Sequence, residues 1–147
     1  MVERSGEIAL MITLEEYFGP WLNSEDVTPE RKQNAIRLLH SVAALEYFAV
    51  RDGVEFPVNP HTGTGVAGQT MGGFRPQFCT QGAPHSAHKE GLAVDRWDPE
   101  GKIDSWCMDN QVLLATCRIW LECPGSTVGW SHWTIRAPAS GRRVFQP

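Results

Sequence analysis

Apolar residues recur at three- and four-residue steps through one long segment, from Thr28 to Gly53. This spacing places them on one face of an α-helix, because a helix turns once every 3.6 residues. Thr28 can cap the helix, Pro29 suits its first position, and Gly53 ends it. His40 falls among the polar positions, so we expect it at the surface. The apolar face consists of Ala35, Leu38, Leu39, Val42, Leu45 and Phe48.

Two further helices are predicted from shorter signals. Thr13–Glu16, with the sequence TLEE, has the form of a capping box, which predicts a short helix from about Glu15 to Phe18. Asp104 is placed to cap a second amphipathic helix over residues 105–122, SWCMDNQVLLATCRIWLE. The residues expected on its inward face are Trp106, Leu113, Leu114, Cys117, Trp120 and Leu121.

Strands are predicted where apolar and polar positions alternate. GLAVD, over residues 91–95, and TVGWSHWTIR, over residues 127–136, both show this alternation. A short strand is also expected over Val54–Val58. In the strand within residues 127–136, one face holds Trp130, His132 and Thr134, and the other holds Ser131 and Trp133.

Residues 54–84 are rich in Gly, Pro, Thr and Gln. A segment of this length is unusual as a simple connection within a compact domain, and such loops are commonly functional. We therefore expect an ordered loop that wraps a site. The whole chain of 147 residues has the length of one domain, 1–147, large enough to bury roughly two thirds of its unfolded surface.

The composition of the chain argues against several classes of function. Hydrophobic residues make up 41% of the chain and charged residues 20%, as in soluble globular proteins. The net charge of −4 argues against a nucleic-acid partner, which would favour a basic face. No apolar run approaches the ~20 residues of a membrane-spanning helix, so no membrane partner is expected. The N-terminal segment lacks the apolar core of a signal peptide, which predicts synthesis and folding in a cytoplasm.

The four cysteines form no CxxC pair and no tight framework. We therefore expect free, partly buried thiols rather than a disulfide scaffold. They are Cys79, Cys107, Cys117 and Cys123.

The segment SAHKEGLAVD carries the candidate chemistry. His88 and Asp95 are seven residues apart, and Gly91 between them would weaken a helix, so a loop followed by a strand is expected. His132 lies on a second predicted strand and can meet the other two if the strands are neighbours. Two imidazoles and one carboxylate leave the fourth tetrahedral position open, a pattern typical of catalytic zinc sites.

The same segment resembles the S-x-H-x-x-G-x-A-x-D signature of zinc D-Ala-D-Ala carboxypeptidases and L-alanyl-D-glutamate endopeptidases, a family that shares its fold with the hedgehog signalling domain. Every fixed position is filled, by Ser86, His88, Gly91, Ala93 and Asp95. The resemblance implies an α+β fold in which a small antiparallel sheet is backed by two or three helices. This fold class agrees with the helices and strands predicted above.

Two flanking segments extend the resemblance to roughly residues 13–135. GGFRP resembles a family segment whose arginine faces the substrate, which implies that Arg75 binds substrate or a developing oxyanion. GWSHW resembles the strand that carries the third ligand, here His132. The resemblance implies Zn²⁺ as cofactor and peptidoglycan stem peptides as substrate, with Ser86 of the signature beside the substrate. Trp130 shares a predicted strand face with His132, so we expect it to line the substrate cleft or to pack over the metal. The C-terminal sequence is similar to phage and prophage members, which implies synthesis in a bacterial host and either virion association or release at lysis.

One position departs from the family pattern. Active members carry a general base two or three residues before the last zinc histidine, where this chain has Trp130 and Gly129. Neither can accept a proton, and loss of a general base removes ~2–4 orders of magnitude in rate. The replacement candidates are His85 and Glu90, near His88 in the sequence, and Glu122, at the end of the second predicted helix.

Two hypotheses of function follow. In the first, the protein is a zinc metallopeptidase, a carboxypeptidase or endopeptidase that hydrolyses cell-wall stem peptides. In the second, it is a catalytically degenerate zinc-binding module with a binding or virion-structural role. The complete ligand set, Arg75 and the open fourth position favour the first hypothesis, whereas the absent acid favours the second. The sequence leaves the bond cleaved, the base and the oligomeric state open.

Overall fold

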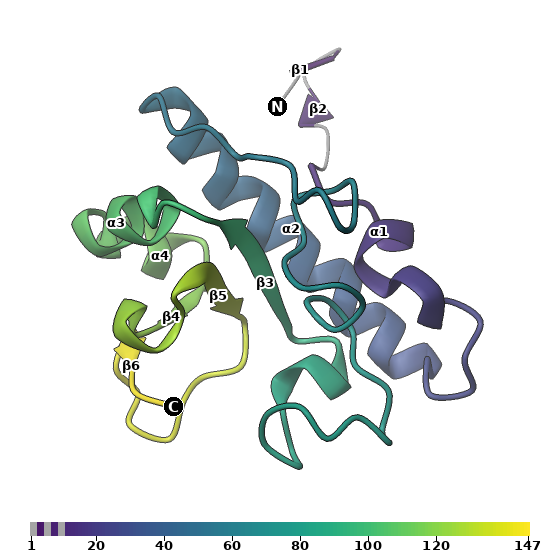
Figure 1. Ribbon diagram of the computed structural model, residues 1–147. Coiled ribbons are helices and arrows are strands. Elements are labelled where there is room, and N and C mark those ends of the chain that lie inside the picture. The colour runs from purple at the N-terminus through teal and green to yellow at the C-terminus, as the bar shows by residue number, and fades with distance from the viewer. Residues whose placement is uncertain (1–2, 5–6, 9–10) are drawn as a thin grey trace.

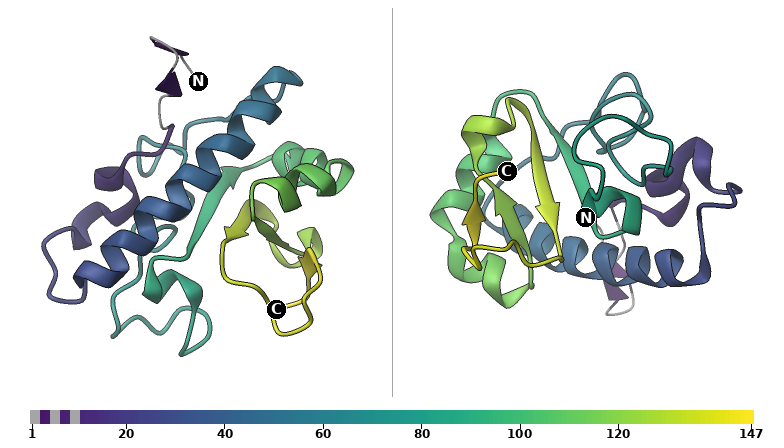
Figure 2. Two further views of the ribbon diagram at one scale, coloured as in Figure 1. Left: turned by 180° about the vertical axis from the view of Figure 1, so that it is seen from behind. Right: turned by 90° about the horizontal axis from the view of Figure 1, so that it is seen from below.

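A four-stranded sheet lies at the centre of the fold, and a long helix, α2 (Pro29–Arg51), runs along one of its faces (Figures 1 and 2). The computed structural model describes residues 3–4, 7–8 and 11–147. In the order in which they lie side by side, the strands are β3 (Ala93–Asp98), β5 (Gly129–Thr134), β4 (Trp120–Glu122) and β6 (Val144–Phe145). A separate antiparallel pair is formed by β1 (Glu3–Arg4) and β2 (Glu7–Ile8). The predicted α+β class is confirmed.

The register of the sheet determines which side chains share a face. Strand β5 pairs antiparallel with both β3 and β4, while the edge strand β6 runs parallel to β4, which the sequence did not predict. Asp95 is directly opposite His132. Trp133 and Leu121 are opposite each other on the face that packs into the core. The predicted alternation of faces in β5 is confirmed.

The first two helices begin where the sequence predicts. Helix α1 (Leu14–Phe18) starts with a complete capping box between Thr13 and Glu16, and α2 is capped by Thr28. Helix α2 ends at Arg51, next to the expected end, and its apolar face is buried apart from the partly buried Phe48. His40 is exposed, as predicted.

The predicted helix over residues 105–122 is wrong in its extent. The chain forms α3 (Lys102–Asp109), α4 (Gln111–Thr116) and then strand β4, separated by a break at Asn110 and a left-handed turn at Arg118 with φ 61°. Pairing with β5 and β6 outweighs the helical periodicity of the final residues. Asp104 lies inside α3 rather than capping it, and the carboxylate of Asp98 accepts the first amide hydrogen bonds instead.

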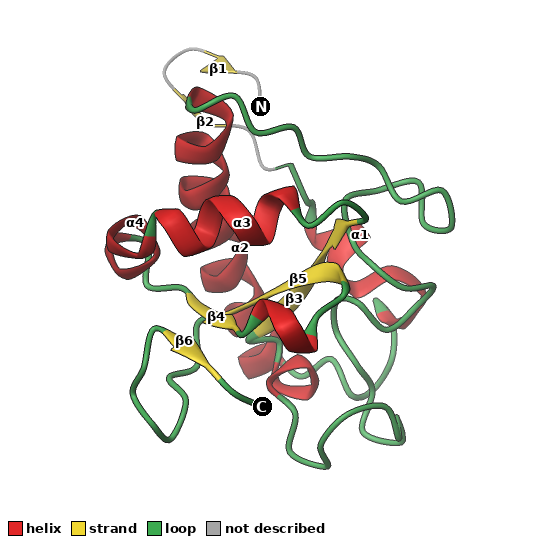
Figure 3. Cartoon of the chain, turned by 60° about the vertical axis from the view of Figure 1, so that its left-hand side comes forward, coloured by secondary structure: helices red, strands yellow, loops and turns green. Residues whose placement is uncertain are grey.

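No strand forms over Val54–Val58, because this segment has no strand partner and Pro57 and Pro60 cannot donate backbone hydrogen bonds. The loop instead forms backbone contacts with β3 further along the chain, near Val66 and Ala67. The amide of Ala67 donates to the carbonyl of Asp95 at 2.8 Å, and a bridge links Val66 to Arg96. Figure 3 shows how much of the chain beside β3 is ordered loop. The expectation of a loop that wraps the site is therefore met by residues 65–75.

A buried ion pair joins the sheet to α2. Arg96 is 1% exposed and pairs with Glu46, which is fully buried on the helix. The guanidinium carbon of Arg96 lies 4.6 Å from the centre of the Phe56 ring, so an aromatic face covers the charge. Burial raises the pKa of Glu46, and the charge of Arg96 opposes this shift. The hydrophobic pattern of α2 gave no indication of a buried glutamate.

The remaining short elements are three 3₁₀ turns, η1 (Gly19–Trp21), η2 (Ala87–Glu90) and η3 (Pro124–Ser126). All four cysteines are free, as expected. Among the helices of the described residues, none has the length and apolar character needed to cross a membrane.

Candidate metal centre

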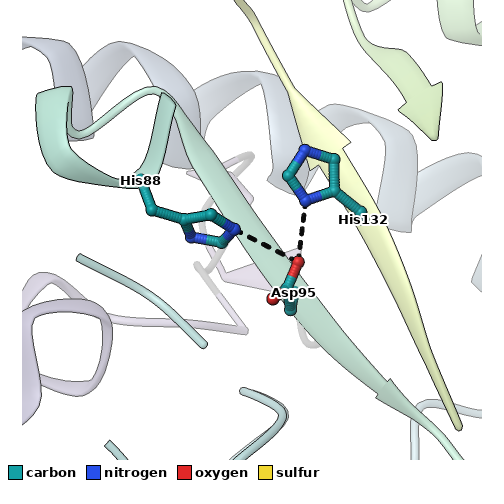
Figure 4. A group of neighbouring side chains, drawn as sticks. All are labelled: His88, Asp95 and His132. Atoms are coloured by element: carbon teal, nitrogen blue, oxygen red, sulfur yellow. Dashed lines mark hydrogen bonds and ion pairs between the residues drawn. The ribbon is translucent and has the colours of Figure 1, made fainter. Parts of the chain in front are cut away.

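Three side chains from three different elements converge on one point (Figure 4). His88 comes from η2, Asp95 from β3 and His132 from β5. The Oδ1 atom of Asp95 lies 3.3 Å from Nε2 of His88 and 2.8 Å from Nδ1 of His132. The structure thus brings together the three predicted ligands, and they form a group that could hold a metal ion. We call His88, Asp95 and His132 the metal group.

The spacing between His88 and Asp95 fits a tetrahedral cation, whereas His132 lies closer to Asp95, at the 2.8 Å distance of a hydrogen bond. Bonds of ~2.0–2.2 Å place neighbouring ligand atoms ~3.3–3.6 Å apart, close to the distance between His88 and Asp95. Nδ1 of His88 lies 2.7 Å from the carbonyl oxygen of Gly73, which can only accept a hydrogen bond. That contact places the proton on Nδ1, so Nε2 keeps the lone pair that a metal needs.

Burial and mutual charge set the protonation of the group. Burial lowers the pKa of His88, which keeps its ring neutral. Burial acts to raise the pKa of Asp95, but the two histidines outweigh it and hold this pKa well below its usual range. Burial also lowers the pKa of His132, but the hydrogen bond and charge of Asp95 outweigh it and raise the pKa overall. The group therefore offers an ionised carboxylate and one neutral imidazole, while His132 has to release a proton before it can bind a divalent cation.

The fixed residues of the signature have local structural roles. The Ser86 hydroxyl accepts a hydrogen bond from the amide of His88 and caps η2. Gly91 follows η2 with φ 75°, and a Cβ there would lie 2.6 Å from the carbonyl oxygen of Arg31 on α2. Both a left-handed turn and close helix packing thus demand glycine at this position. The result is a rigid turn that holds His88 over the sheet.

Gly73 is a second position where only glycine fits, and sequence reasoning missed its role. A Cβ there would lie 2.1 Å from the carbonyl oxygen of Tyr17. The close approach places the Gly73 carbonyl under His88, where it orients the ring. Its only signal in the sequence was its place in the GGFRP segment.

Arg75 contacts the metal group directly. Its Nη2 atom lies 3.3 Å from Oδ2 of Asp95, while Nε donates to the carbonyl of Met71 at 2.7 Å and Nη1 to that of Gln81 at 3.3 Å. All three nitrogens therefore have protein partners. The guanidinium orients the carboxylate of Asp95 and ties the loop to it, and it also lines the adjoining cavity.

Replacing Arg75 with lysine is expected to lower metal affinity about 10- to 100-fold, because an ammonium cannot hold Asp95, Met71 and Gln81 together. Titration of the metal-free protein with Zn²⁺ against a competing chelator measures the effect. Arg37→Lys, on the exposed face of α2, is the matched control. Unchanged zinc affinity in Arg75→Lys would show that Asp95 needs no such support.

A cleft passes over the metal group. Two hollows of about 470 Å³ and 540 Å³ adjoin at residues that line both of them: Arg75, Gln81, Asp95 and Trp130. The first hollow also contains Ser86, and the second is bordered by residues 67–72. Volumes of this size are typical of small-molecule and peptide sites. The predicted substrate residues Ser86 and Trp130 thus both lie on the cleft that contains the metal group.

The three candidate bases are placed very differently. Glu122 lines the first hollow. Glu90 forms an ion pair with Arg31 at 3.2 Å, and this pair joins η2 to α2. His85 is exposed and is not among the residues that border the cleft. Among these three residues, the structure brings only Glu122 to the cavity of the metal group.

Glu122 lies on strand β4 rather than at a helix end, which corrects the sequence-based expectation. Continuing the register of β4 and β5 by one residue places Glu122 opposite His132 on the same face. Directly opposed residues have Cβ atoms about 4.5–5.5 Å apart. Burial raises the pKa of Glu122, and the charge of His132 opposes the shift. A carboxylate therefore stands beside the metal group, contributed by the neighbouring strand.

Gly129 cannot serve as the position of the acid in this structure. It begins β5 with φ 97°, a conformation that side-chain-bearing residues rarely adopt. It also lines a different hollow, with Glu100 and Asp104, rather than the cleft. At Gly129 the chain therefore departs from the pattern of the family it resembles in backbone conformation as well as in residue type.

No protein-family model, curated protein or solved structure matches the chain. The metal group and the cleft around it are therefore the basis for inferring function.

Proposed function

We propose that the protein is a zinc-dependent peptidase that hydrolyses the stem peptides of bacterial cell wall. One observation carries the proposal: Glu122 lines the same cavity as the His88, Asp95 and His132 group and, by register, lies opposite His132. A cation site and a carboxylate in one cleft are the two parts that metal-assisted hydrolysis needs. The resemblance of SAHKEGLAVD to the peptidase signature supports the choice of substrate.

His88, Asp95 and His132 would hold the Zn²⁺ ion, since two imidazoles and one carboxylate are a common catalytic zinc set. When bound, Zn²⁺ polarises a carbonyl group and lowers the pKa of a water molecule. Arg75 keeps Asp95 in place through its second carboxylate oxygen. The Gly73 carbonyl fixes the ring of His88.

Glu122 acts as the general base in this proposal. Its carboxylate accepts a proton from the attacking water as the new C–O bond forms at the scissile carbonyl. It then returns that proton to the amide nitrogen as the C–N bond breaks, so that the products are an amine and a carboxylic acid, which ionises on release. A raised pKa suits both halves of this exchange, because it brings the group closer to the operating pH.

The walls of the cleft suit a peptide with small side chains. Trp130 lies on the same face of β5 as His132 and lines both hollows, where it can pack against substrate. Ser86 lines the first hollow. The alanine-rich stem peptide of peptidoglycan has the small residues that such walls accommodate. Phage or prophage origin, with action on the wall of a bacterial host, is part of the same proposal.

A second candidate function is a zinc-binding module without catalysis, in a binding or virion-structural role. The observation that favours it is Gly129, which stands where the resembled family has its acid. In this alternative Glu122 is a partly buried residue of β4 and nothing more. The two candidate functions differ in one expected result: the peptidase hydrolyses stem peptides, and the binding module does not.

The test is hydrolysis of purified peptidoglycan and of synthetic stem peptides by the Zn²⁺-loaded protein. We expect new amino groups to appear with time, and the zinc chelator 1,10-phenanthroline to abolish the reaction. Re-addition of Zn²⁺ should restore it. Zinc-loaded protein that remains inert on every stem peptide would contradict the peptidase proposal and favour the binding module.

A further inference from the structure

The cleft contains a second arginine that the proposed chemistry does not use. Arg136 lines the first hollow together with the metal group. Its side chain is exposed, and among the described residues no carboxylate lies within ion-pair distance of it. Arg75 differs in this respect, because Asp95 already balances its charge. Arg136 is therefore the arginine in this hollow whose charge is left for a ligand.

Arg136 is held in place at the end of β5. Its backbone amide donates to the hydroxyl of Thr134 at 3.1 Å, and that hydroxyl donates to the carbonyl of Leu92 at 2.8 Å. Its Nη2 atom donates to the carbonyl of His85 at 2.9 Å. This last bond uses one of five guanidinium hydrogens. The remaining donors are anchored at the wall of the cleft and have a planar geometry that matches a carboxylate.

The surroundings of Arg136 are apolar and small. Ala83, Ala87, Ala137, Pro138 and Phe145 line the same hollow. A carboxylate bound by Arg136 would contact these apolar side chains as well as the guanidinium.

The distance between Arg136 and the metal group limits the length of the ligand. Arg136 follows His132 by four positions, and because β5 ends at Thr134 the two residues are at most about 13 Å apart along the chain. A peptide of up to about four residues covers that span. A carboxylate bound by Arg136 would thus belong to the same short peptide whose amide lies over the metal group.

We propose that Arg136 binds a carboxylate of the substrate, so that the acidic end of the peptide lies between Pro138 and Phe145 and the rest runs over the metal group towards residues 67–72. This inference rests on the proposed peptidase function and gives the substrate a direction in the cleft. Stem peptides carry carboxylates both at the C-terminus and on the D-isoglutamyl residue. The shared chemistry is the carboxylate, and the choice between the two is left to experiment.

The experiment measures peptide binding to the metal-free protein by calorimetry, where hydrolysis does not interfere. The probes are N-acetyl-D-alanyl-D-alanine, its C-terminal amide, and L-alanyl-γ-D-glutamyl methylamide, whose single carboxylate is internal. We expect one of the two carboxylate peptides to bind at least about tenfold more tightly than the amide. Arg136→Gln should bring that peptide to the affinity of the amide, while Arg136→Lys should retain part of the preference.

Arg142→Gln is the matched control, an exposed arginine of the same C-terminal segment that does not line the cleft. It should bind all three probes like the parent protein. A preference for N-acetyl-D-alanyl-D-alanine identifies the terminal carboxylate as the ligand, and a preference for the methylamide identifies the internal one. Equal binding of every probe by the parent and Arg136→Gln, with or without a loss of thermal stability, would overturn the inference.

The outcome is separable from that of the peptidase proposal. Arg136-dependent binding without turnover of any stem peptide would leave a carboxylate-binding cleft and remove the peptidase. Turnover that is insensitive to Arg136→Gln, together with equal binding of the probes, would leave the peptidase and remove the subsite.

Discussion

Replacing Glu122 with glutamine is expected to lower kcat/KM for stem-peptide hydrolysis by ~10²–10⁴, the usual contribution of a general base. Glutamine has nearly the same shape but cannot accept the proton of the attacking water. Glu122 is not one of the three ligands of the metal group, so the variant should keep its full complement of zinc. Steady-state kinetics and elemental analysis of the same preparation measure both effects.

The other candidate bases provide the controls. Glu90→Gln removes the ion pair with Arg31, and His85→Ala removes an exposed ring, so both variants should hydrolyse the peptide at close to the parent rate. Adding Gly129→Glu to Glu122→Gln should not restore activity, because Gly129 has a positive φ and lines another hollow. A parent-like rate in Glu122→Gln would disprove its role as the base.

Replacing His132 with alanine is expected to reduce bound zinc from about one equivalent to well below it, and to abolish hydrolysis. The variant leaves His88 and Asp95 as a two-ligand site, whereas catalytic zinc sites have three protein ligands. Inductively coupled plasma mass spectrometry after gel filtration measures the metal content. A variant that retains a full equivalent would show that the metal lies elsewhere.

Thermal unfolding gives an independent measurement of the same site. Zinc that binds only the folded state stabilises it by about 2.7 kcal/mol at a hundredfold excess over Kd. Added Zn²⁺ should therefore raise the Tm of the parent protein but not that of His132→Ala. His40→Ala, on the exposed face of α2, is the matched control and should behave like the parent.

The sequence predicted the metal group because its signals are local. Asp95 and His132 lie on strands whose alternation is readable, and Gly91 marks the turn that positions His88. Helix α2 was equally readable from its apolar spacing and its Thr28 cap. In these cases a few neighbouring residues determine each element, and the pairing of β3 with β5 then brings the ligands together.

The surroundings of the metal group were less predictable because they depend on pairing between distant segments. The residues WLE continue the apolar period of a helix, and only the partners β5 and β6 make them a strand. Glu122 enters the cleft through that pairing. Arg136 escaped notice for a similar reason, since its place beside the metal group follows from the end of β5 and the turn at His85. The zinc identity and the peptidase activity stay predictions.

The buried pair of Arg96 and Glu46 has a consequence for strand alignment. Asp95 and Arg96 are consecutive on β3, so one side chain faces the metal group and the other faces α2. A slip of β3 by a single residue would exchange the two faces. It would place an arginine in the cation site and leave Glu46 without a partner. An uncompensated buried charge lowers the stability of the fold by about 3–5 kcal/mol. Two adjacent residues of opposite charge thus make the alignment of the sheet specific, because only the correct register pairs Arg96 with Glu46 and leaves Asp95 in the metal site.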